Sequence, residues 1–147
     1  MEAFHEKKLR FLEEMSNRLR QDVIEMVARA GSGDIGGPLG LAEIVAGFYF
    51  DILNHNPKQP EWPDRDRLVV SNGHVCPVMY AALARAGYFP VDELKTLRML
   101  NSRLQGHPHR TALPGIETTS GPLGSGLSQA IGMALAAKLD KKKSRVY

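Results

Sequence analysis

A glycine-rich turn that leads directly into a helical pattern is the feature that most constrains how this chain can fold. The turn spans Gly121–Gly126, and Leu127, Ile131, Leu135 and Leu139 then repeat every fourth residue, as on one face of a helix. Glycine has no Cβ, so it tolerates positive φ and lets a ligand approach the backbone closely. A helix N-terminus also presents free N–H groups and a positive dipole end, which suits a diphosphate or another anion. A plain loop-to-helix connection, with glycines for close packing, also explains these residues.

The first part of the chain predicts one long helix over about residues 4–30. An apolar stripe runs along one face of it, and Gly31-Ser32-Gly33 ends it. Residues 31–36 match the dinucleotide pattern G-x-G-x-x-G, but that fingerprint must follow a strand, and this one follows a helix. Pro38 suits the first turn of a second helix that extends to about Leu53. The stripe of the first helix comprises Phe4, Phe11, Met15, Leu19, Val23, Met26 and Ala30, and the face of the second comprises Leu41, Ile44, Val45, Phe48 and Ile52.

A short apolar run at Arg67–Ser71 reads as a buried parallel strand. The turn that follows it carries His74. Ligands gather outside the carboxyl ends of strands in open α/β sheets, so His74 is well placed to contact one. Residues 76–86 and 92–100 read as helices, and residues 145–147 as the start of another strand. The pattern predicts an α/β fold with a parallel sheet flanked by helices, with residues 1–147 as one partial domain of a larger unit.

Composition argues against several classes of protein. No apolar run approaches the roughly 20 residues that span a bilayer, and the N-terminus has no signal-peptide core, so a membrane protein is not expected. The single cysteine, Cys76, excludes an internal disulfide, and we expect a cytoplasmic protein. The net charge is +3, with a basic run at residues 141–145. This run reads as a solvated helix end rather than a nucleic-acid patch, because no recognition motif accompanies it.

Four motifs occur together and in order along the chain. They are Ser32–Gly40 (SGDIGGPLG), Ser71–His74 (SNGH), Gly106–Pro108 (GHP) and Pro114–Gly126 (PGIETTSGPLGSG). Together they resemble the N-terminal pyrophosphate-binding domain of transketolase, over nearly the whole chain. The phrases at residues 87–90 and 102–108 look most like the split form of the family, whose N- and C-terminal halves are separate subunits.

The resemblance implies an enzyme that uses thiamine diphosphate to move a two-carbon ketol unit from a ketose phosphate to an aldose phosphate. It implies that His74 contacts the diphosphate and that His107 lies near the thiazolium ring and the substrate oxygens. It also implies that the loop of Gly121, Pro122, Leu123 and Gly124 holds the aminopyrimidine, with backbone groups of Gly121 and Leu123 in contact. His55 and His109 match no motif and are expected at the surface. For Glu117 we expect a structural role, such as capping or pairing with Arg110.

Two departures from the family pattern accompany this resemblance. Asp34 stands at a substrate-binding position where the family commonly has histidine, and a carboxylate repels a phosphate that a protonated imidazole attracts. The family's Gly-Asp-Gly loop, which binds Mg²⁺, would lie beyond Tyr147, as would the glutamate that the C-terminal half supplies. We therefore expect the 147 residues alone to be inactive and to bind thiamine diphosphate and Mg²⁺ weakly. The active form would be a homo- or hetero-oligomer with that C-terminal half and a site between subunits.

Other functions fit part of the same pattern. A related thiamine diphosphate enzyme, such as a deoxyxylulose phosphate synthase or a transketolase for an unusual ketose, would share these motifs. The segment Pro114–Gly124 favours transketolase over the synthase. A truncated, non-catalytic interaction module is the alternative that Asp34 and the missing metal loop support.

Overall fold

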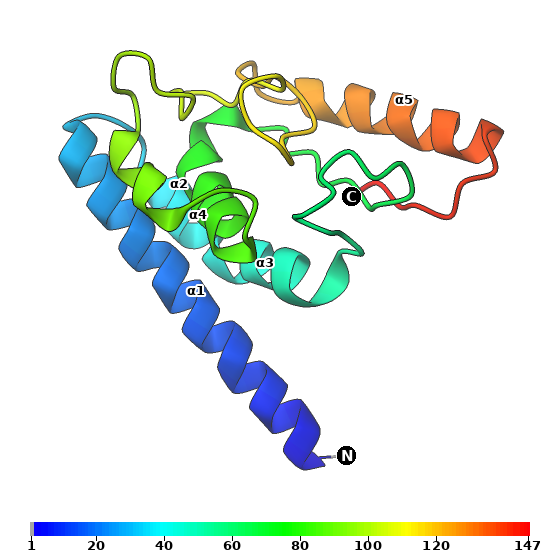
Figure 1. The fold of residues 1–147 in the computed structure, drawn as a ribbon, viewed down its shortest axis with the longest axis horizontal. Helices are drawn as coiled ribbons and strands as arrows, with labels where there is room; N and C mark the ends of the chain where they lie inside the picture. The colour runs from blue at the N-terminus through cyan, green and yellow to red at the C-terminus, as the bar shows by residue number, and fades with distance from the viewer. Residues whose placement is uncertain (1) are drawn as a thin grey trace.

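The longest element is α1, Glu2–Ala30, which confirms the predicted first helix. The computed structural model describes the backbone of residues 2–147 and the side chains from Phe4 onward. Only the second half of the α1 stripe is buried: Leu19 and Val23 are inaccessible to solvent, whereas Phe4 and Phe11 are exposed. The reason is visible in Figure 1, where the N-terminal half of α1 extends past the other helices.

The helix at the centre of the core is α4, Cys76–Ala86, with the bounds that the sequence predicts. Pro77 occupies its first turn, and Gly87 ends it in the left-handed conformation with a φ of 95°. Nine of its residues are buried, which means that it is covered on all sides. It packs against α1 and against α3, Ala42–Gly47.

The second predicted helix is divided into three pieces. These are α2 (Gly36–Gly40), α3 and the π-helical turn η1 (Phe48–Ile52), with a break in the helical geometry at Leu41. Val45 is buried as predicted, and Leu41 and Phe48 are half-buried. Ile44 and Ile52 are exposed, and Ala42, Ala46 and Tyr49 complete the buried face.

The predicted helix at residues 92–100 is also shorter than expected. It forms only the 3₁₀ segment η3, Val91–Thr96. Arg98 and Asn101 have positive φ values, so the chain reverses there. Leu97 stays in the core, and Leu100 is left 93% exposed.

The predicted parallel sheet is reduced to a single point of pairing. Residues 2–147 contain no regular strand, only an isolated parallel bridge between Arg67 and Val146. The bridge includes hydrogen bonds of 2.9 Å from the Arg67 N–H to the Arg145 carbonyl and from the Tyr147 N–H to the Arg67 carbonyl. The direction of pairing is the predicted one. One bridged pair of residues, without a regular strand on either side, is too little to make a sheet.

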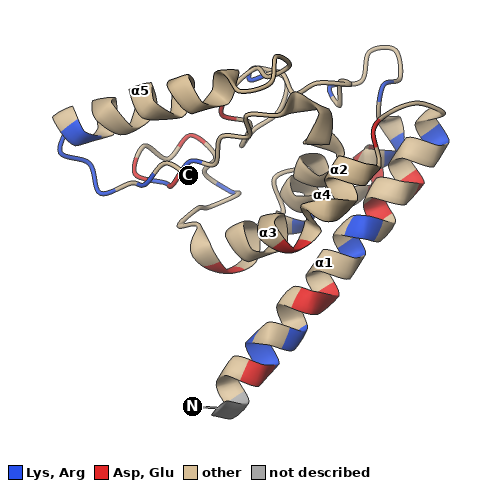
Figure 2. Ribbon diagram, turned by 180° about the vertical axis from the view of Figure 1, so that it is seen from behind, with Lys and Arg blue, Asp and Glu red and all other residues tan. Residues whose placement is uncertain are grey.

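The last helix, α5, spans Ser125–Leu139 and starts at the glycine-rich turn as predicted. Its apolar stripe faces outward: Leu127, Ile131, Leu135 and Leu139 are between 52% and 82% exposed. Figure 2 shows α5 almost free of charged side chains until its C-terminal end. Despite this apolar character, no helix of residues 2–147 is both long and apolar enough to cross a membrane.

The difference between the buried and exposed faces of α1 gives a direct test of the fold. We expect Leu19→Ala to lower the free energy of unfolding by about 2–5 kcal/mol, because the side chain is fully buried and its removal leaves a cavity. Leu9→Ala, on the same helix but 58% exposed, should change it by less than about 0.5 kcal/mol. Urea unfolding of both variants measures this, and equal losses would contradict the placement of α1.

Candidate functional site

Two turns that are far apart in the sequence meet at the candidate site. The first is the 3₁₀ turn η2, Gly73–Val75, with the residues just before it, and the second is the loop that leads into α5. A Cβ on Gly73 would lie 2.8 Å from the backbone carbon of Ser120, and a Cβ on Gly126 would lie 2.7 Å from the Cα of Ser71. Both positions therefore require glycine, because the two backbones are in direct contact.

Hydrogen bonds from the loop to the end of the bridge segment hold this contact. The Gly124 N–H donates to the Ser71 carbonyl and the Gly126 N–H donates to the Ser71 hydroxyl, each at 3.0 Å. The Ser120 hydroxyl donates to the Val70 carbonyl at 3.3 Å. The glycine-rich loop is thus fastened on both sides of residues 121–123.

These bonds correct one expectation from the sequence. The N–H groups at the start of α5 are used within the protein: besides those to Ser71, Ser125 donates to Pro122 at 3.5 Å and Leu127 donates to Gly124 at 3.4 Å. They are not free to bind a diphosphate. Of the glycines in this turn, Gly126 serves close backbone packing, as in the simpler of the two interpretations, and Gly124 provides a positive φ of 87°.

The structure brings His74 and His107 together. Their ring centroids lie 4.7 Å apart with the planes at 85°, an edge-to-face contact. Asn72 Oδ1 accepts from the His74 backbone N–H at 3.2 Å and lies 3.1 Å from His74 Nδ1. The Asn72 oxygen can only accept, so His74 Nδ1 is the donor in this contact.

Gly121 lies beside this pair, and the rest of its loop is open to solvent. A Cβ on Gly121 would lie 4.0 Å from His107 Cδ2. Pro122, Leu123 and Gly124 are exposed, with Leu123 at 71%. His107 is exposed too, and it borders a surface hollow of about 410 Å³ lined also by Arg98, Met99, Ser102, Leu104, Gln105 and Gly106.

Asp34 lies in the exposed turn between α1 and α2. Arg98 connects this turn to the loop of His107. The Arg98 guanidinium lies 3.5 Å from the Ser32 hydroxyl. It also lies directly against Gly106, where an added Cβ would be 2.9 Å from Arg98 Nε. The structure thus links the segment of Asp34 to the hollow beside His107, although Asp34 is not part of the histidine contact.

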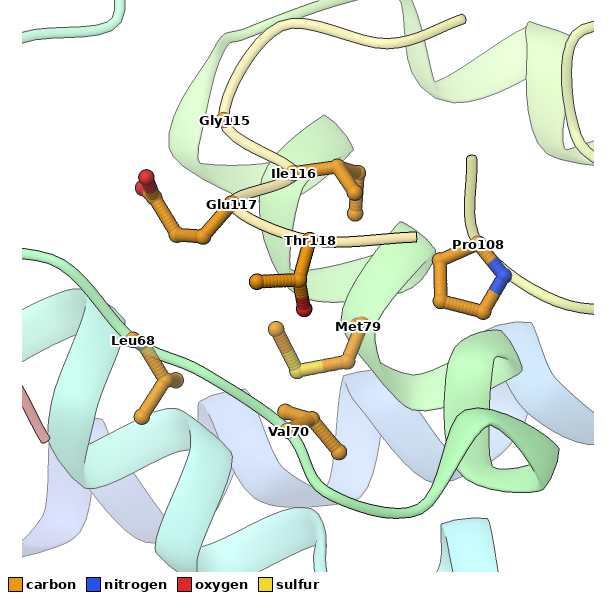
Figure 3. Close-up of a pocket in the computed structure, with 8 residues that line it drawn as sticks. All are labelled: Leu68, Val70, Met79, Pro108, Gly115, Ile116, Glu117 and Thr118. Atoms are coloured by element: carbon orange, nitrogen blue, oxygen red, sulfur yellow. The ribbon is translucent and has the colours of Figure 1, made fainter. Parts of the chain in front are cut away.

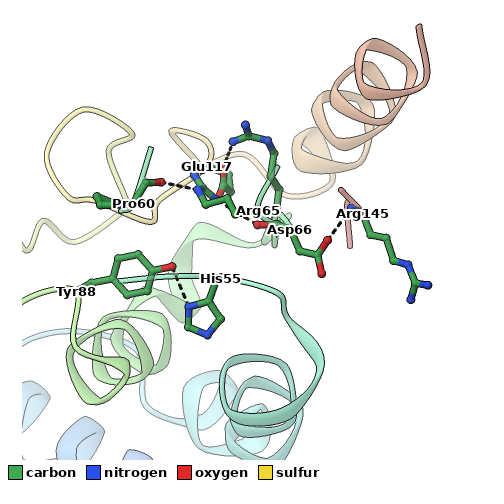
Figure 4. Close-up of polar contacts among 8 residues, drawn as sticks. His55, Pro60, Arg65, Asp66, Tyr88, Glu117 and Arg145 are labelled. Atoms are coloured by element: carbon green, nitrogen blue, oxygen red, sulfur yellow. Dashed lines mark hydrogen bonds and ion pairs between the residues drawn. The ribbon is translucent and has the colours of Figure 1, made fainter. Parts of the chain in front are cut away.

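The polar cluster around Glu117 was not predicted in full. Its buried carboxylate forms ion pairs with Arg65 and with Arg67, the latter at 3.0 Å (Figure 4), and not with Arg110 as expected. Burial alone would lower the pKa of Arg65, but the hydrogen bond and charge of Glu117 outweigh it and raise that pKa. The prediction of a structural role for Glu117 is right, but the predicted partner, Arg110, is wrong. The sequence feature that could have revealed this cluster is the pair of Arg65 and Arg67, two residues apart at the start of the predicted strand.

His55, which was expected at the surface, is half-buried. Its Nδ1 lies 3.0 Å from the Tyr88 hydroxyl and its Nε2 lies 2.8 Å from the Tyr49 carbonyl, and the ring stacks on Tyr88 (Figure 4). His109 is exposed, as expected.

A second, apolar cavity lies between α4 and residues 115–118, and it is too small to hold a cofactor. Its volume is about 20 Å³, room for about one water molecule. In Figure 3, Met79 and Val70 face its centre, while the Glu117 carboxylate points away. Within the part of the chain that the structure describes, no group of three or more His, Cys, Asp or Glu side chains could hold a metal ion.

Comparison with known proteins identifies the domain. Residues 12–145 match the family model "Transketolase, thiamine diphosphate binding domain". The sequence is 51% identical over 121 residues to transketolase 2 of Xanthobacter flavus, covering 82% of this chain and 18% of that protein. It is 46% identical over 126 residues to the transketolase of Buchnera aphidicola, covering 85% of this chain and 19% of that protein.

Solved structures agree with the sequence comparison. The transketolase of Leishmania mexicana superposes with a TM-score of 0.82 at 42% identity, over 85% of this chain and 19% of that one. The Pichia stipitis transketolase in complex with sedoheptulose 7-phosphate superposes with a TM-score of 0.84 at 39% identity, over 92% and 21%. The fold and the motifs therefore define a thiamine diphosphate-binding domain. The chain belongs to the transketolase family, and it spans about a fifth of the length of these relatives.

The contact between the two turns can be tested without any ligand. We expect Gly73→Ala to lower the free energy of unfolding by about 1–3 kcal/mol, because its Cβ would collide with the backbone at Ser120. Gly132→Ala is the matched control: it lies within α5 with no atom near its Cβ, and should raise stability by about 0.5–1 kcal/mol. Urea unfolding measures both, and a neutral Gly73→Ala would refute the close approach.

Proposed function

We propose that the protein containing this chain transfers a two-carbon ketol unit from a ketose phosphate to an aldose phosphate with bound thiamine diphosphate. The observation that carries the proposal is the edge-to-face pair of His74 and His107 beside Gly121, in a domain of the transketolase family. The crystallised complex of the Pichia stipitis relative with sedoheptulose 7-phosphate supports sugar phosphates as the substrate class. The relatives of this chain are named transketolase, which favours this reaction over that of deoxyxylulose phosphate synthase.

Each site residue has a proposed role that its surroundings support. His74, with Nδ1 held by Asn72, would contact the diphosphate through Nε2, which must itself carry a proton to bond a phosphate oxygen. His107 borders the hollow and would hold a proton near the substrate oxygens. The loop of Gly121, Pro122, Leu123 and Gly124 would hold the aminopyrimidine, chiefly through backbone groups of Gly121 and Leu123, because those of Gly124 are bonded to Ser71 and Leu127. When bound, thiamine diphosphate supplies the electron sink for cleavage of the carbon–carbon bond.

The remainder of the active site would come from elsewhere. The chain spans about a fifth of its relatives, so we assign the Mg²⁺ ligands, the activating glutamate and part of the sugar site to the C-terminal portion or partner subunit. A diphosphate–Mg²⁺ unit needs several oxygen ligands in near-octahedral geometry. We propose an oligomer with the site between subunits, acting in the cytoplasm.

The roles of the two histidines can be tested in the full-length protein with a ketose phosphate donor and an aldose phosphate acceptor. We expect His74→Ala and His107→Ala each to lower kcat/KM by about 10²–10⁴-fold, the usual range for lost acid–base or positioning groups. His109→Ala, an exposed histidine two residues away, should leave it within about twofold. Full activity in both site variants would overturn the proposal.

Asp34 favours a second possibility, a different ketose or a non-catalytic module. Its exposed carboxylate would repel a sugar phosphate. We expect Asp34→His to lower the KM for ordinary ketose phosphates by roughly three- to tenfold, equivalent to about 1 kcal/mol of charge interaction. Asp64→His, in an exposed loop, is the control. An unchanged or higher KM would mean that Asp34 serves a different substrate.

A further inference from the structure

The position of His107 depends on groups outside its own loop. Residues 97–124 contain no helix or strand, and the His107 side chain is exposed, so neither local structure nor burial holds it. Two consecutive carbonyls immediately before it, those of Gln105 and Gly106, are turned toward α4. These two contacts tie the residues just before the histidine to α4.

The donors to those carbonyls come from one face of α4. The Tyr80 hydroxyl donates to the Gln105 carbonyl at 2.8 Å, and the Cys76 thiol donates to the Gly106 carbonyl at 3.2 Å. The two residues are four apart, hence one above the other on the helix. Tyr80 is fully buried and Cys76 is 2% exposed, so both donor groups are fixed within the core.

Both donors keep their protons at neutral pH. Burial raises the pKa of the Cys76 thiol to about 12 and raises the pKa of Tyr80 above its ordinary value. The cysteine thus acts as a protonated donor and not as a reactive thiolate.

The same helix also places the other histidine. His74 is two residues before Cys76, in the turn that leads directly into α4. On the far side of His107, the Ser120 N–H donates to the Pro108 carbonyl at 3.1 Å. His107 is therefore held from α4 on one side and from the glycine-rich loop on the other.

We propose that Tyr80 and Cys76 are positioning residues that set His107 against His74 by holding the carbonyls of Gln105 and Gly106. This inference rests on the proposed function for the role of His107 in catalysis. The geometric part, that α4 determines the position of the His107 loop, stands on the hydrogen bonds alone.

The geometric part is tested by hydrogen–deuterium exchange of the full-length protein without ligand. We expect Tyr80→Phe to speed amide exchange in the peptide around residues 105–109 by roughly tenfold, with peptides of α1 unchanged. Tyr88→Phe is the matched control, because it also removes a tyrosine hydroxyl, one bonded to His55. Faster exchange throughout the chain, or none near His107, would overturn the proposal.

The catalytic part is tested by kinetics and a double-mutant cycle. Tyr80→Phe should lower kcat by roughly three- to tenfold, with the affinity for thiamine diphosphate and Mg²⁺ within about twofold. In a His107→Ala background the same change should have no further effect on kcat, because its action passes through His107. An additive loss of kcat would contradict the proposal.

Two variants of Cys76 test whether the hydrogen-bond donor, and not the size of the side chain, is what matters. Cys76→Ser keeps a donor and should retain kcat within about twofold, whereas Cys76→Ala should lower it as Tyr80→Phe does. Equal losses in both would overturn the role of the thiol. If His107→Ala itself proves fully active, the proposed function fails for that residue, and the exchange experiment still decides whether α4 holds its loop.

Discussion

The candidate site depends on a contact between two backbones that leaves no room for a side chain. The turn at Gly73 lies against Ser120, and the start of α5 at Gly126 lies against Ser71. About fifty residues separate the partners in each pair, so the core must bring them together before the contact can form. Once it has formed, His74, His107 and Gly121 become neighbours. The glycines are thus needed for packing before any question of ligand binding arises.

A buried ion cluster anchors the other end of the glycine-rich segment. Placing the Glu117 carboxylate out of water is costly, and the two arginines offset that cost by charge and by hydrogen bonds. Arg67 is also half of the parallel bridge with Val146, and Asp66 Oδ1 accepts from the Arg145 N–H at 2.7 Å. Through Glu117, the ion cluster joins the chain just before the glycine-rich loop to the parallel bridge. Ser71 holds the other end of that loop, at Gly124 and Gly126. Residues 121–123 between these anchors remain open to solvent, which suits a loop that offers its backbone to a ligand.

The sequence predicts those parts of the fold whose signals are local. The bounds of α4 follow from Pro77 at its start and Gly87 at its end, and the start of α5 follows from the glycine-rich turn. The buried face of α3 and η1 was predicted only in part: Val45 is buried as expected, but Ala42, Ala46 and Tyr49 take the places beside it that Ile44 and Ile52 were expected to fill. The partners of Glu117 and the donors from Tyr80 and Cys76 lie 25 to 52 residues away in the sequence, beyond any local pattern. The motif positions of His74, His107 and Gly121 were identified from resemblance, but their mutual contact needed the structure.

The same kind of apolar repeat has opposite outcomes on two helices. On α1, Leu19, Val23 and Met26 are buried because α3 and α4 cover that face. On α5, an equally regular stripe of Leu127, Ile131 and Leu135 faces solvent. Periodicity therefore reports that a helix has an apolar face, and burial depends on whether another element lies against that face. The area exposed on α5 is unfavourable in water, roughly in proportion to its size. This helix is tied to the rest of the chain at its N-terminus by the bonds to Ser71, and beyond its C-terminus by the bridge between Val146 and Arg67.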